Sequence, residues 1–161
     1  MVLLACAAAS LPAQDKAICS LLTASDVSAL GVTGAGIETS MPYDTGAQKG
    51  SMKLCNWRMP TGGIHLAVVK VPPGASRESL DKLKRDSWAM LEAQGWTKDK
   101  QDFGGISCLL MTPPAAQKSA PLTTECSTLT KGTLVQVSTL GKTKVPMEKA
   151  KALVESVIGR L

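Results

Sequence analysis

The sequence is poor in the residue types that carry most catalytic chemistry. Its 161 residues include one histidine, His65, and only 3% are aromatic. Nucleophilic catalysis by serine or cysteine needs a nearby base, and His65 is the one imidazole that could serve. It lies in the middle of an alternating, strand-like run, where a histidine on a sheet face is the expected role. We therefore expect no catalytic residues and no enzyme activity.

Nucleic-acid, metal and cofactor sites also lack their usual signals. With so few aromatics the chain offers no stacking platform, and it shows no recognition motif, so we expect no nucleic-acid partner. Its cysteines form no C-x-x-C pair and its seven methionines no M-x-x-M cluster, so we expect no metal. The glycines between Gly31 and Gly36 follow a short helix rather than a strand, which predicts a connector and no cofactor.

Long apolar runs are missing as well. After the N-terminus no stretch approaches the roughly 18 to 20 apolar residues of a spanning helix, so the mature domain should not cross a membrane. Residues 1–10 are uncharged, and Pro12 and Ala13 then precede a polar segment. This pattern predicts a signal segment at 1–13, cut after Ala13, and a single domain at 14–161.

Two forms of the exported protein remain open. Cleavage after Ala13 would give a soluble periplasmic or secreted domain. The residues from Leu3 to Cys6 also fit the lipoprotein peptidase pattern, which would leave a lipid anchor on Cys6 and tether the domain to a membrane.

Cysteine parity supports export. Of five cysteines, Cys6 leaves with the signal or carries lipid, and an even set remains: Cys19, Cys55, Cys108 and Cys126. In an oxidising compartment such a set forms structural disulfides. Four cysteines allow three pairings, and the sequence does not choose among them. A bridge between Cys108 and Cys126 is geometrically natural, because both fall on strands that could lie side by side.

The remaining patterns predict an α+β fold, with an antiparallel β-sheet flanked by helices on one or both faces. Residues 31–50 should be a loop with at most a short strand at 36–40. The other expected elements are a helix capped by Thr23 and Asp26 and ended by Gly31, a hairpin of 53–59 with 64–71, a helix from Ser76 to Gln94, strands at 96–98 and 106–112, a hairpin of 122–129 with 133–140, and a helix after Pro146.

Basic residues exceed acidic ones, giving a formal net charge of +5. Four lysines gather near the start of the last helix, and we expect this group to contact an anionic surface: Lys142, Lys144, Lys149 and Lys151. The first hypothesis is therefore a non-enzymatic envelope domain that binds a partner protein or an anionic envelope component. The alternative is a periplasmic module that binds a small ligand or a metal between the sheet and a helix.

One family resemblance accompanies these patterns. The string from Cys19 to Thr23 with Leu30-Gly31, and then Cys55-Asn56-Trp57, resembles the C-x-L-L-T…L-G…C-x-W pattern of small bacterial exported domains and lipoproteins of unknown function with a PsbP-like fold. The resemblance implies a Cys19–Cys55 bridge and an α/β/α sandwich around an antiparallel sheet. It implies no reaction. Cys108 and Cys126 depart from the family's usual pattern.

Overall fold

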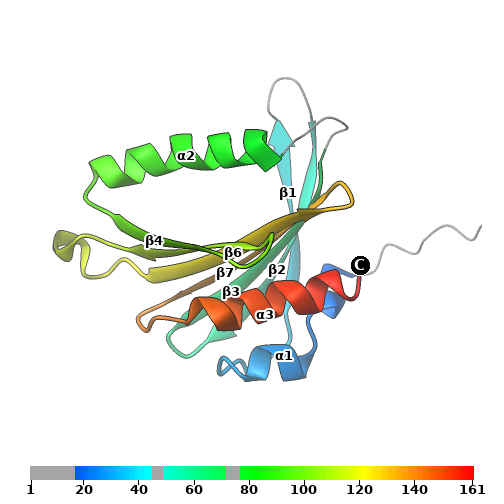
Figure 1. Cartoon of the computed structure of the whole chain (residues 1–161). Helices are drawn as coiled ribbons and strands as arrows, with labels where there is room; N and C mark the ends of the chain where they lie inside the picture. The colour runs from blue at the N-terminus through cyan, green and yellow to red at the C-terminus, as the bar shows by residue number, and fades with distance from the viewer. Residues whose placement is uncertain (1–16, 45–48, 72–76) are drawn as a thin grey trace, which may run out of the picture.

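The computed structural model describes residues 17–44, 49–71 and 77–161. The predicted signal cleavage, the lipid anchor at Cys6 and the Ser76 cap lie outside these residues. The chain forms a seven-stranded sheet in the order β1-β2-β3-β7-β6-β5-β4, with every described pair antiparallel (Figure 1). The strands are β1 Ile37–Asp44, β2 Lys49–Met59, β3 Gly62–Lys70, β4 Thr97–Asp102, β5 Ser107–Thr112, β6 Leu122–Thr130 and β7 Thr133–Gly141. The predicted α+β class with an antiparallel sheet is confirmed.

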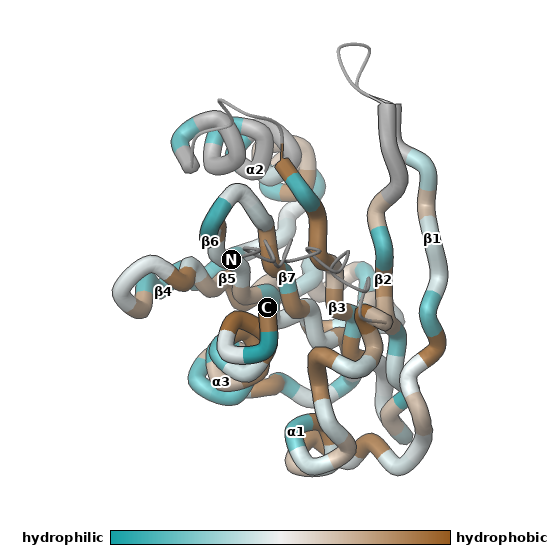
Figure 2. The backbone as a smooth tube through the Cα atoms, turned by 90° about the vertical axis from the view of Figure 1, so that its right-hand side faces the viewer, coloured by the Kyte–Doolittle hydropathy of each residue, from teal (hydrophilic) through white to brown (hydrophobic). Residues whose placement is uncertain are grey.

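Helices lie on both faces of this sheet (Figure 1), and the turned view shows α2 on one side of the strands and α3 and α1 on the other (Figure 2). The 3-10 helix η1 (Ile18–Leu21), α1 (Ala24–Ser28) and α3 (Met147–Ile158) lie on one face, called here the α3 face. The long helix α2 (Arg77–Ala93) lies on the other, called the α2 face, and η2 (Ala115–Gln117) lies between β5 and β6 in the chain. Lys98 of β4 holds the end of α2, because its Nζ pairs with Glu92 at 2.6 Å and lies 5.2 Å from the Trp88 ring.

The main core lies between the sheet and α3. Strand β7 alternates strictly, with Val135 and Val137 fully buried toward α3 and their neighbours only half-buried. Ala150 and Val154 on α3 are also fully buried against this face. Because the strand period is two and the helix period about 3.6, the two apolar stripes meet along one line of contact. The α2 face carries both polar and apolar side chains, and Trp88 of α2 and Leu109 of β5 are buried there.

Two disulfides brace the α3 face. Cys19 pairs with Cys55 and so fixes η1 to β2, with a Cα–Cα distance of 5.2 Å. Cys108 pairs with Cys126, its direct partner across β5 and β6. The first bridge is the one that the family resemblance implies. The second is the one that the expected neighbouring strands favour.

The two edge strands are longer than the sequence predicts, and both expectations were wrong. The predicted loop at 31–50 contains β1 and the start of β2, and the predicted strand at 96–98 extends to Asp102. Pro42 lies within β1 because an edge strand needs backbone partners on one side only. All six residues of β4 are exposed and four of them are charged, so it has no apolar alternation to reveal it.

None of the helices within the described ranges is both long and apolar enough to cross a membrane.

Candidate functional site

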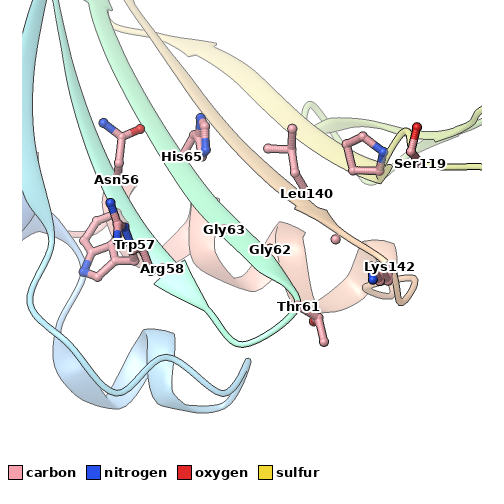
Figure 3. Close-up of a pocket in the computed structure, with 12 residues that line it drawn as sticks. Asn56, Trp57, Arg58, Thr61, Gly62, Gly63, His65, Ser119, Leu140 and Lys142 are labelled. Atoms are coloured by element: carbon pink, nitrogen blue, oxygen red, sulfur yellow. The ribbon is translucent and has the colours of Figure 1, made fainter.

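A hollow of about 480 Å³ opens on the α2 face, where the β2–β3 hairpin ends beside β7 and the segment before β6 (Figure 3). The residues that give it chemical character are Asn56, Arg58, His65, Ser119, Leu140 and Lys142. They come from β2, β3, β7 and two connecting segments that are far apart in sequence.

Strand register explains how these side chains meet. Asn56 lies directly opposite His65, and Arg58 lies opposite Gly63, which in turn lies opposite Leu140. Directly opposed residues of an antiparallel pair share a face, so Asn56, Arg58, His65 and Leu140 all project to the α2 face. Arg58 and His65 are diagonal neighbours, a spacing that long side chains can span.

Glycines form the floor of the hollow. A Cβ atom at Gly63 would lie 3.4 Å from His65 Nε2, so the imidazole lies above this residue. At Gly62 a Cβ would lie 2.7 Å from the Cα of Gly141, because the two backbones approach closely there. The Lys142 amide donates to the Thr61 carbonyl at 3.1 Å and fixes the chain at this rim. A side chain at either glycine would fill the site or push β7 away.

The charge around the hollow has one sign. Arg58 and Lys142 are cationic and exposed, and none of the lining residues in the described chain is aspartate or glutamate. Desolvation lowers the pKa of His65 below its usual 6.5, so the ring is mostly neutral at pH 7. Its nitrogens can then offer one donor and one acceptor. Such an arrangement favours an anionic group that takes charge from the two cations and a hydrogen bond from the ring.

The four predicted lysines are not gathered at this site. Lys142 lines the hollow, whereas Lys144 and Lys149 are exposed in the β7–α3 connection and on α3. Lys151 pairs with Glu155 at 2.6 Å and lies 5.9 Å from the Phe103 ring. The four lysines are close in sequence, but in the structure they are spread over both faces of the sheet.

Sequence reasoning did not select Asn56, Arg58 or Ser119. Asn56 and Arg58 could have been found from the predicted hairpin of 53–59 with 64–71, because its register places both residues beside His65. Ser119 and Lys142 lie at the hollow only because β3 pairs with β7. No local sequence pattern predicts that pairing.

Metal ligands are not grouped in the described part of the chain: no three histidine, cysteine, aspartate or glutamate side chains lie together there. The cysteines Cys19, Cys55, Cys108 and Cys126 are all used in disulfides.

Comparison with known proteins identifies a shared fold. No family model matches the chain, and no curated protein matches its sequence. The structure is similar to the crystal structure of the extracellular domain of PknH from Mycobacterium tuberculosis, with a TM-score of 0.59 and 14% sequence identity. The match covers 88% of this chain and 92% of that one. At this identity the likeness shows the fold and nothing of the site.

Proposed function

We propose that this chain is an exported, non-enzymatic domain that binds an anionic component of the cell envelope. The observation that carries the proposal is the hollow on the α2 face, where Arg58, His65 and Lys142 surround one space without a lining carboxylate. Cations that share a concave, partly desolvated surface attract an anion more strongly than the same cations on a convex surface.

The dimensions of the hollow favour a small anionic group over a folded partner protein. Its volume of about 480 Å³ lies within the range of small-molecule sites, roughly 300 to 1,000 Å³. Leu140 adds an apolar wall, so a ligand with both charge and some apolar surface suits the site. The proposal therefore joins the anionic-component hypothesis to the small-ligand alternative and leaves the metal alternative aside.

Two features support export. Disulfides form and persist in oxidising compartments, and this chain has two. The PknH domain that shares this fold is extracellular. A PsbP-like family assignment, periplasmic location and a lipid anchor at Cys6 belong to the same proposal, and the Cys19–Cys55 bridge supports the first of them.

Intact mass of protein purified from the envelope fraction tests export directly. We expect a chain beginning at Gln14 with four oxidised cysteines, or a diacylglyceryl group on Cys6 with the same four oxidised. Masses with and without reduction and alkylation read processing and cysteine state together. Full-length protein with free thiols would contradict export.

Charge reversal tests the binding site. Arg58→Glu should weaken binding of methyl phosphate at least tenfold, because it replaces an attractive charge at the hollow by a repulsive one. Chemical-shift titration of labelled protein with methyl phosphate gives the dissociation constant. Arg58 is exposed, so the variant should fold.

Lys149→Glu is the matched control for this titration. It makes the same change of charge on α3, across the sheet from the hollow, where salt at physiological strength screens its effect over about 8 Å. We expect less than a twofold change in the dissociation constant. An equal loss in both variants would mean that net charge alone, rather than the site, attracts the anion.

A further inference from the structure

Two exposed apolar side chains lie on β1, on the face of the sheet that carries the hollow. Among the described residues, four large apolar side chains are prominently exposed: Ile37 at 58%, Met41 at 51%, Met90 at 65% and Leu161 at 58%. Single exposed apolar residues are common and need no explanation. Ile37 and Met41, however, lie on the same strand, β1, four residues apart, and therefore point to the same face.

That face is the one that carries the hollow. Ile37 is the direct partner of Asn56, and Asn56 is the direct partner of His65. The Asn56 Nδ2 donates to Thr39 Oγ1 at 3.3 Å, and Thr39 lies between the two exposed apolar residues on β1. One hydrogen-bonded side chain therefore joins the wall of the hollow to β1.

The apolar surface extends onto β2. Leu54 lies opposite Thr39, and Met52 lies opposite Met41, with both side chains half-buried on the same face. We call Ile37, Met41, Met52 and Leu54 the apolar strip. From Ile37 to Met41 it runs about 14 Å, four residues at roughly 3.4 Å each, and it is two strands wide, about 5 Å between strand axes.

We infer that the ligand of the hollow is a single-chain anionic amphiphile, with its charged head at Arg58 and His65 and its chain along the apolar strip. This inference rests on the proposed function and names the ligand class of the same site. The size of the strip favours a single hydrocarbon chain over a partner protein as its occupant. A stable protein interface buries about 800 Å² on each partner, far more than four side chains on two strands can offer. A single hydrocarbon chain matches a strip of this length and width.

The test compares ligands that differ in their chain or in their head group. The full chain is titrated with methyl phosphate, decyl phosphate and uncharged decyl maltoside, each kept below its micelle concentration. We expect decyl phosphate to bind at least tenfold more tightly than methyl phosphate, because each added methylene is removed from water when it packs on the apolar strip. Decyl maltoside should bind more weakly than decyl phosphate, because it lacks the charge.

Variants separate the strip from the head site. Ile37→Ser with Met41→Ser should weaken decyl phosphate binding at least fivefold and leave methyl phosphate binding unchanged. Met90→Ser, an equally exposed apolar residue on α2, is the matched control and should change neither. All three positions are exposed, so the fold should tolerate the changes.

The outcomes distinguish this inference from the proposed function. Equal affinities for methyl and decyl phosphate, both lost in Arg58→Glu, would overturn the amphiphile and leave the anion site standing. Binding that Arg58→Glu does not alter would overturn both. Retention on anionic vesicles without binding of monomeric decyl phosphate would identify a membrane surface instead and overturn the single-chain ligand.

Discussion

Replacing Cys19 and Cys55 together by alanine is expected to lower the free energy of unfolding by about 4 kcal/mol, the largest effect that any pair of substitutions named here should have. The bridge closes a separation of 36 residues, and its loss frees the unfolded chain from that constraint. It also releases η1, whose Ile18 and Leu21 are buried against the sheet. Thermal unfolding followed by circular dichroism should show a midpoint about 8 to 15 °C lower.

Two controls assign this loss to the bridge. Reduction of the wild-type protein should lower the midpoint at least as far, since it opens both bridges without changing the sequence. Cys108→Ala with Cys126→Ala opens a separation of only 18 residues, and we expect a smaller loss of about 3 kcal/mol. A Cys19–Cys55 variant with an unchanged midpoint would show that the bridge does not contribute to stability.

Local signals predicted the parts of the fold that depend on neighbours in sequence. The cap at Thr23 is present as expected, with its amide donating to Asp26 Oδ2 at 2.7 Å. The predicted hairpin of 122–129 with 133–140 is also present, and Lys131 and Gly132 in its turn both have the positive φ that a tight hairpin favours. Such features need a few residues only and can be recognised without the sheet.

The edge strands escaped prediction because they bury little. Strand β4 carries Lys98, Asp99, Lys100 and Asp102 and is exposed along its length, so no hydrophobic period marks it. Charged residues on an edge also prevent pairing with other chains. Strand β1 contains Pro42, which would exclude a central strand and is tolerated where one side has no partner.

The site was only partly predictable for a related reason. His65 was visible as the single histidine, and its expected place on a sheet face agrees with the structure. What surrounds it depends on β3 pairing with β7, strands that are separated in sequence by α2 and three other strands. The lysines from 142 to 151 were grouped by sequence distance, yet only Lys142 reaches the hollow.

Asp26 connects three elements on the α3 face, and its charge should matter to stability. Thr23 donates to its carboxylate from both the amide and the hydroxyl, at 2.7 and 2.8 Å. Arg160 approaches Oδ2 at 2.8 Å, and Ser156 Oγ donates to Oδ1 at 3.2 Å, so α3 is joined to α1. Arg160 also donates to the Leu21 carbonyl in η1 at 2.8 Å. The Asp26 side chain is only 16% exposed, so solvent screens these contacts weakly.

Asp26→Ala should therefore lower the free energy of unfolding by about 2 to 4 kcal/mol at pH 7, from loss of the carboxylate half of the capping box and of the charge-assisted hydrogen bonds to Thr23, Arg160 and Ser156. Glu155→Ala is the control, because it removes an acid from the Lys151–Glu155 pair on α3, in which Glu155 is exposed. There we expect a loss of at most about 0.5 kcal/mol. Urea unfolding of both variants and the wild type gives the comparison.

The same pair of variants predicts a pH dependence. Burial alone would raise the pKa of Asp26, but hydrogen bonds from Thr23, Arg160 and Ser156 outweigh it and lower the pKa below 3.8. Because the folded state holds this proton less tightly than the unfolded state, the stabilisation is complete above about pH 5 and is lost as the pH falls through the folded-state pKa. The difference between wild type and Asp26→Ala should thus shrink below pH 4, while the Glu155→Ala difference stays small throughout. A difference that grows on acidification would contradict the ionised network, since it would require Asp26 to stabilise the fold in its protonated form.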